Sequence, residues 1–88
     1  MSDEATVRDT VLTEVSKASG TPKSDLADDN TLQKDLGISS ENFVILAQNL
    51  RAFIRASNPQ QTLLLKEINT ASATVGSVIT LVINRANP

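Results

Sequence analysis

The chain has 88 residues and a net charge of −2, with ten acidic and eight basic residues. It contains neither Cys nor His, which excludes disulfides, thiolate metal sites and a Ser–His–Asp triad. It has no Trp or Tyr and only two Phe, so it lacks aromatic platforms for stacked bases. These properties indicate one small domain over residues 1–88, and we expect a protein that is not an enzyme.

The charges are unevenly distributed along the chain. Residues 1–36 hold eight acids and four bases, a balance of −4, and residues 37–88 hold two acids and four bases, a balance of +2. The sequence begins with an acidic stretch, and no apolar run reaches the roughly 20 residues that a membrane helix needs. We therefore expect a cytoplasmic monomer that binds neither a membrane nor a nucleic acid.

The first predicted element is a helix over residues 3–19, followed by a long loop over residues 21–37. Ser2 or Asp3 can cap the start of this helix, and Gly20 with Pro22 can end it. Its apolar residues recur at helical spacing: Val7, Val11, Val15 and Ala18. Four apolar residues in and just after the loop are expected to anchor it over the core: Leu26, Leu32, Leu36 and Ile38.

Three further helices are predicted, over residues 39–55, 63–69 and 74–85. The last has the i, i+3, i+4, i+7, i+8 pattern of an amphipathic helix, with Ser72 or Thr74 as its cap. The expected fold is an all-α, small four-helix bundle with three longer helices and one short helix. Six residues are predicted to be largely buried: Val11, Val44, Leu50, Ile54, Val78 and Val82.

The strongest local feature is the stretch Asp35-Leu36-Gly37-Ile38-Ser39-Ser40, where the long loop meets the second predicted helix. Gly37 allows a sharp turn, and Ser39 can cap the helix. The hydroxyl of Ser40 is then expected to be exposed at the first helical position, beside unpaired N–H groups that favour a phosphate ester. The alternative is that the two serines merely cap a helix.

The order of these elements around Asp-Leu-Gly-x-x-Ser resembles acyl carrier proteins and related peptidyl carrier domains, over nearly the whole chain. Residues 30–38 are similar to the loop before the family's modified serine, residues 44–54 have its apolar spacing, and residues 74–78 resemble the start of its last helix. In that family the serine carries a 4′-phosphopantetheine arm, whose thiol holds an acyl or aminoacyl group as a thioester.

The resemblance implies a bundle of the acyl carrier protein type, with 4′-phosphopantetheine bound covalently to Ser40 and no metal. It implies two kinds of partner, a phosphopantetheinyl transferase and the enzymes that load and transfer the acyl group. It also implies that the core between the second and fourth helices can loosen to take an acyl chain.

The sequence departs from the family on its recognition surface. The family's Asp-Ser-Leu is Ser39-Ser40-Glu41 here, and Arg51 and Arg55 lie one helical turn apart on a helix that is usually acidic. These changes favour a dedicated pathway over bulk fatty-acid synthesis. The alternative from another class is a carrier-like interaction module without the arm.

Two further interpretations are weaker. A small helical DNA binder using Arg51 and Arg55 needs more basic residues on one face than this chain offers. The loop aspartates lack the tight spacing and internal glycine of a Ca²⁺ site, so a solvated acidic loop is the simpler interpretation of Asp25, Asp28, Asp29 and Asp35.

Overall fold

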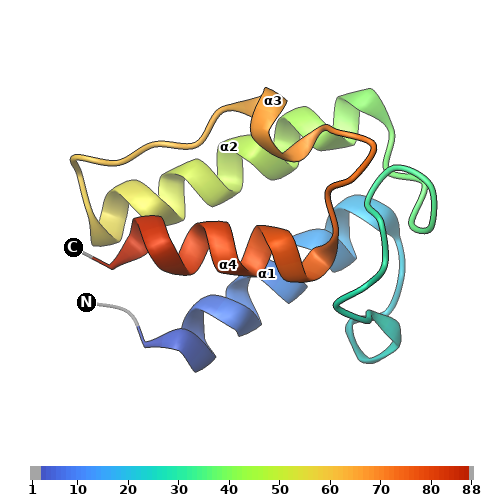
Figure 1. Ribbon diagram of the computed structural model, residues 1–88, viewed down its shortest axis with the longest axis horizontal. Coiled ribbons are helices and arrows are strands. Elements are labelled where there is room, and N and C mark those ends of the chain that lie inside the picture. Colours follow the sequence, from blue (N-terminus) through green and yellow to red (C-terminus); the bar gives the residue numbers. More distant parts are fainter. Residues whose placement is uncertain (1–2, 88) are drawn as a thin grey trace.

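The computed structural model describes residues 3–87, which form helices joined by loops, with no strand in that range (Figure 1). The helices are α1 (Glu4–Ser19), α2 (Ser40–Ser57), α3 (Leu65–Ile68) and α4 (Val75–Ala86), and a 3-10 turn, η1 (Lys23–Asp25), lies in the long loop. The prediction of a small all-α bundle with three longer helices and one short one is confirmed. No helix in this part of the chain is both long and apolar enough to cross a bilayer.

The three longer helices all pack against one another. Helices α2 and α4 run in the same direction and α1 runs the opposite way (Figure 1). As a result, the long loop lies at the same end of the bundle as the starts of α2 and α4. The junction of the loop with α2, where the sequence places the candidate serine, therefore lies at this end of the bundle.

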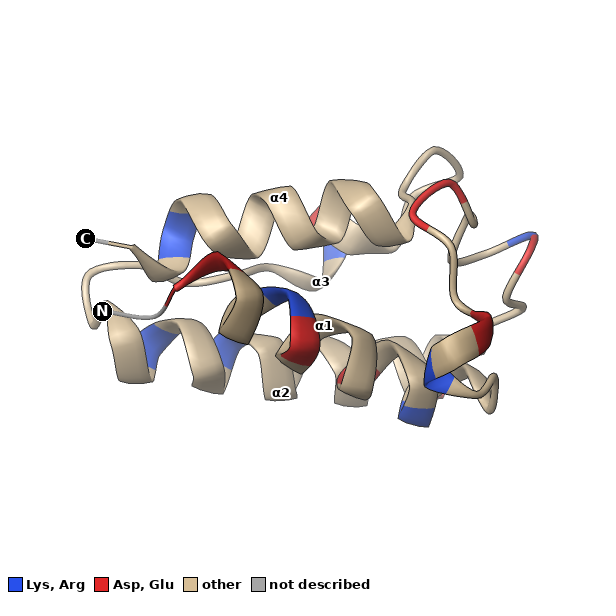
Figure 2. Cartoon of the chain, turned by 90° about the horizontal axis from the view of Figure 1, so that it is seen from below, with Lys and Arg blue, Asp and Glu red and all other residues tan. Residues whose placement is uncertain are grey.

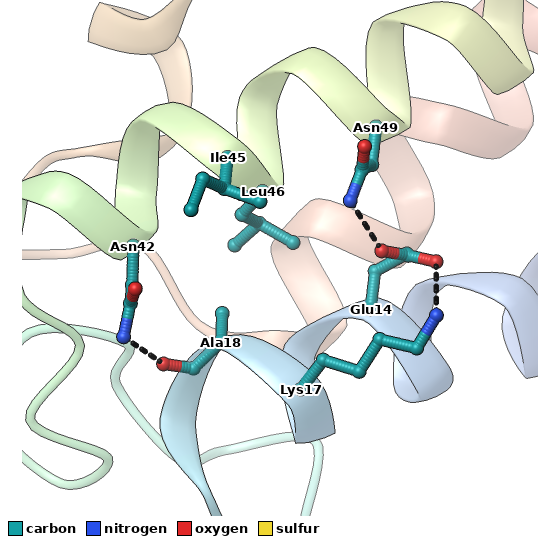
Figure 3. A pocket seen from close by; sticks show the side chains of 7 residues that line it. All are labelled: Glu14, Lys17, Ala18, Asn42, Ile45, Leu46 and Asn49. Carbon is teal, nitrogen blue, oxygen red and sulfur yellow. Dashed lines mark hydrogen bonds and ion pairs between the residues drawn. The ribbon is translucent and has the colours of Figure 1, made fainter.

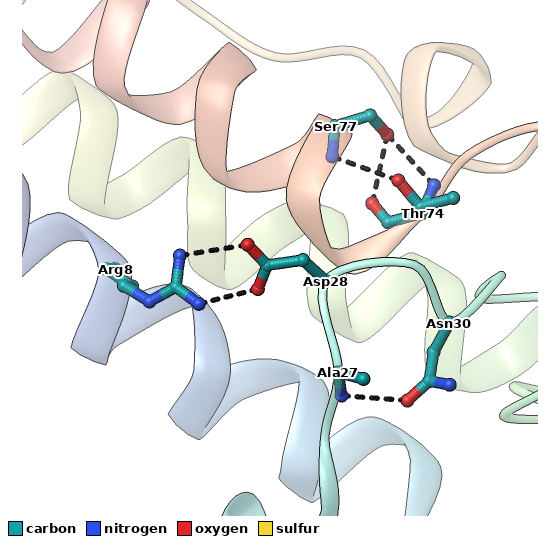
Figure 4. Close-up of polar contacts among 6 residues, drawn as sticks. All are labelled: Arg8, Ala27, Asp28, Asn30, Thr74 and Ser77. Atoms are coloured by element: carbon teal, nitrogen blue, oxygen red, sulfur yellow. Dashed lines mark hydrogen bonds and ion pairs between the residues drawn. The ribbon is translucent and has the colours of Figure 1, made fainter.

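Capping groups fix where the helices begin and end. Asp3 caps α1 by accepting the N–H of Thr6 at 2.7 Å, and Gly20 ends that helix with a left-handed φ of 75°. Thr74 caps α4: its hydroxyl accepts the N–H of Ser77 at 3.1 Å, and the Ser77 hydroxyl accepts the N–H of Thr74 at 2.9 Å (Figure 4). Of the two predicted caps for α4, the structure therefore uses Thr74.

One core is formed by the inward faces of the helices and by the loop. Five of the six residues predicted to be buried are buried, but the prediction for Val44 was wrong, because its side chain is 41% exposed. The buried residues of α2 lie on one arc of the helix, and at about 100° per residue Val44 lies beyond the edge of that arc. The arc consists of Phe43, Leu46, Ala47, Leu50 and Ile54.

The short third helix covers fewer residues than the predicted 63–69. Leu64 has an extended backbone with φ −100° and ψ 143°, so α3 begins only at Leu65 and ends at Ile68. Leu63 is fully buried, but it reaches the core from the connecting segment rather than from a helix. The apolar run at residues 63–65 therefore contains a buried residue of the connecting segment, Leu63, and the first residue of the helix, Leu65.

The long loop is fastened to the start of α4 by backbone hydrogen bonds. The N–H of Leu32 donates to the carbonyl of Ala73 at 3.0 Å, and the N–H of Gly76 donates to the carbonyl of Asp28 at 2.8 Å. A Cβ at Gly76 would lie 3.1 Å from that carbonyl oxygen, so glycine permits the close approach. Arg8 of α1 donates two hydrogen bonds, of 2.5 and 3.2 Å, to the Asp28 carboxylate (Figure 4).

The four apolar residues expected to anchor the loop all pack on the core, but they are buried to different extents. Leu32 and Ile38 are buried, whereas Leu26 and Leu36 are half-buried and pack against the core. The loop is therefore part of the packed structure, and its buried carboxyl-terminal end fixes the position at which α2 begins.

Helix α3 is held to α4 by an ion pair. The two terminal guanidinium nitrogens of Arg85, Nη1 and Nη2, donate to the Glu67 carboxylate, and Glu67 also accepts the N–H of Leu64 at 2.9 Å. The hydrogen bonds from Arg85, and next those from the Leu64 backbone, lower the pKa of Glu67 from 4.5 to about 2.

The Glu67 carboxylate is expected to contribute stability that depends on pH. Because its folded pKa lies below its unfolded value, the contribution is complete above pH 4.5 and disappears as the pH falls towards 2. We expect Glu67→Gln to lower the free energy of unfolding by about 1–2 kcal/mol at pH 7. Urea unfolding at pH 7 and pH 2.5 checks this, since the difference from the unaltered protein should shrink at the lower pH. An equal difference at both values would contradict it.

Candidate functional site

The turn that precedes α2 is built by hydrogen bonds across the end of the loop. The Asp35 carboxylate accepts the N–H of Thr31 at 2.9 Å, and the Thr31 hydroxyl accepts the N–H of Asp35 at 3.0 Å. Gly37 has a left-handed φ of 61°, as the sharp turn predicted there requires. The N–H of Ile38 then donates to the carbonyl of Leu32 at 3.1 Å, and both of these side chains are buried.

Ser39 caps α2, as predicted. Its hydroxyl accepts the N–H of Asn42 at 3.2 Å, and its carbonyl accepts the N–H of Phe43 at 2.9 Å. Phe43 is buried in the core. The first turn of α2 is therefore fixed both by the cap and by a large core side chain, which gives Ser40 a rigid support.

Ser40 is the first residue of α2 and is exposed to solvent. Its hydroxyl makes no hydrogen bond within residues 3–87, and the N–H groups of Ser40 and Glu41 have no acceptor in that range. The free hydroxyl thus lies beside two unpaired donors, at the positive end of an 18-residue helix. This arrangement accommodates a phosphate ester on Ser40 without disturbing the cap.

A small pocket of about 110 Å³ lies between α1 and α2 (Figure 3). At its rim, Asn42 donates to the carbonyl of Ala18 at 3.0 Å, and Asn49 donates to the carboxylate of Glu14 at 2.9 Å. The side chains of Ile45 and Leu46 supply its apolar part. At about 100° per residue, Ile45 and Asn49 lie roughly 140–180° around α2 from Ser40. The pocket and the candidate serine therefore face different sides of the helix.

Two apolar residues in the first two turns of α2 are exposed, although the sequence did not identify them as surface residues. Val44 is 41% exposed and Ile45 is 53% exposed. Val44 follows Ser40 by four residues and so lies on the same side of α2. The signal was available in the sequence, because consecutive apolar residues at 43–46 cover too wide an arc to be buried together.

Arg51 and Arg55 lie on α2 beyond the candidate serine. Figure 2 shows basic but no acidic positions on the half of α2 that lies away from the long loop, and Glu41 is the only acid of this helix. The loop acids are not gathered around these arginines. Asp28 binds Arg8 and Asp35 binds the Thr31 backbone.

The predicted loop acids are dispersed rather than clustered. Within residues 3–87, no group of three or more acidic side chains lies close enough together to hold a metal ion. The structure thus brings together Gly37, Ser39 and Ser40 at one helix start, and it leaves the two arginines several turns away along the same helix. Comparison with protein-family models, with curated proteins and with solved structures finds no match for this chain.

Proposed function

We propose that this chain is a specialised acyl carrier protein, which holds an acyl or aminoacyl group on a 4′-phosphopantetheine arm attached to Ser40. The observation that carries the proposal is the free, exposed hydroxyl of Ser40 at the rigid start of α2. The two unpaired N–H groups beside it are suitable donors for the ester phosphate. When bound, the arm supplies a thiol that holds the cargo as a thioester.

The fold supports this proposal in a second way. The carrier resemblance requires a first long helix, a long ordered loop that leads into the modified serine, a second long helix, a short helix and a last long helix. Residues 3–87 have these elements in that order. In this role the protein leaves the chemistry to separate enzymes. Its own contribution is effective concentration, because a tethered group meets each enzyme locally instead of by free diffusion.

The direct test is the intact mass of the protein purified from its native host, compared with that of Ser40→Ala. We expect the unaltered protein to carry a pantetheine adduct and Ser40→Ala to carry none. The helical circular dichroism of the variant should be unchanged, because Ser39 remains to cap α2. An adduct that survives in Ser40→Ala would disprove the assignment.

A second function is favoured by a specific observation on the same surface. Ser39 and Glu41 flank Ser40, and both are exposed where a transferase would approach. A carrier-like module that has lost the arm and binds a protein partner accounts for these residues. The native-host mass separates the two proposals, since this module carries no adduct at all.

A further inference from the structure

The four arginines of the chain fall into two pairs. Arg8 and Arg85 each bind a carboxylate through two nitrogens, on Asp28 and Glu67. Arg51 and Arg55 make no hydrogen bond or ion pair within residues 3–87. Helix α2 has no acid after Glu41, and the one acid of α3, Glu67, is already bound by Arg85.

These arginines belong to one exposed surface of α2. At about 100° per residue, Val44, Gln48, Arg51 and Arg55 lie within roughly 80° of the direction of Ser40. We call these four residues the α2 strip. Val44, Gln48 and Arg55 are exposed and Arg51 is half-buried. The strip therefore begins with an apolar residue next to the candidate serine and ends with two cations that have no carboxylate partner.

The cations are too far from Ser40 to act on a group bound there. With a rise of about 1.5 Å per residue, Arg51 and Arg55 lie roughly 16 and 22 Å along the helix from Ser40. A phosphate on Ser40 is therefore outside their reach. Nucleic acid is also a poor fit, because strong binding needs several phosphates neutralised together and this strip offers two positive charges.

We propose that the α2 strip docks a protein partner whose own surface is acidic around an apolar contact. This proposal rests on the proposed carrier function and specifies the partner's surface. The partner would receive the group on Ser40 at one end of the strip and place carboxylates against Arg51 and Arg55 at the other end. Complementary charges there steer association and fix the orientation of the carrier, while Val44 supplies the apolar contact.

The test uses a defined probe, a helical peptide with glutamates flanking two leucines, titrated into the ¹⁵N-labelled protein. We expect amide shifts to concentrate between residues 44 and 55. The variant Arg51→Gln/Arg55→Gln should bind the peptide about fivefold to tenfold more weakly, as expected for the loss of two exposed ion pairs. The control Lys17→Gln/Lys34→Gln removes the same net charge from exposed lysines away from the strip, and it should bind as the unaltered protein does.

Three results would overturn the proposal. The first is an equal loss of affinity in the control variant, and the second is a set of shifts spread over all basic residues. The third is equal or tighter binding of a short DNA duplex to the same strip. The failure of the carrier function is a separate outcome, because it is measured by the intact mass of the protein from its native host and not by peptide binding. Docking without any adduct would retain the strip and favour the interaction module.

Discussion

We expect Leu50→Ala to lower the free energy of unfolding by about 2–5 kcal/mol. Leu50 is fully buried in the middle of α2, which packs against both α1 and α4. Truncation removes apolar contacts to the core and leaves a cavity that the surrounding helices can close only in part. Since small domains have about 5–15 kcal/mol of stability in total, the change should be plain in a urea or thermal unfolding curve.

Val44→Ala is the matched control for this change. Val44 lies on the same helix and loses apolar atoms too, but its side chain is 41% exposed. We therefore expect a loss below about 1 kcal/mol, as for most surface substitutions. If Val44→Ala were as costly as Leu50→Ala, the packing of α2 described above would be wrong.

The helices were predictable because their signals are local. Asp3, Ser39 and Thr74 have side chains that can accept a backbone N–H, and each caps the helix that follows it. The left-handed turn at Gly37 follows from glycine's conformational freedom in the same way. The rigid helix start at Ser40 could therefore be predicted from a short stretch of sequence.

The remaining features depend on contacts between distant segments. The bonds of the loop to Ala73 and Gly76, and the ion pair between Glu67 and Arg85, join residues that no local pattern connects. Val44 was wrongly predicted to be buried because apolar spacing gives the width of an apolar stripe and not which part of it meets the core. That Arg51 and Arg55 have no acidic partner within residues 3–87 likewise depends on how the helices pack, which the spacing along α2 does not give.

Residues around Ser40 are expected to control which transferase modifies the protein. A transferase that serves bulk fatty-acid synthesis is expected to dock through a cationic surface. On this protein that surface would face the uncharged Ser39 at the position where the family has an aspartate, and Arg51 further along α2. We expect slow modification of the unaltered protein. The double change Ser39→Asp/Glu41→Leu should raise the rate about tenfold, because a complementary anion and an apolar contact are restored. Arg51→Glu should raise it further, and modification followed by mass spectrometry measures each rate.

The variant Ser39→Asn/Glu41→Leu separates recognition from helix capping. Asn and Asp both accept the N–H of Asn42 as Ser39 does, so the fold should be retained in both variants. Only Asp adds the anion, and its advantage over Asn should diminish as added salt screens the charges. Rapid modification of the unaltered protein, at the rate of an ordinary carrier, would refute the mismatch. If the Ser39→Asp/Glu41→Leu protein stays unmodified by every transferase tried, the exposed serine has a different use, and the interaction module becomes the better account of this surface.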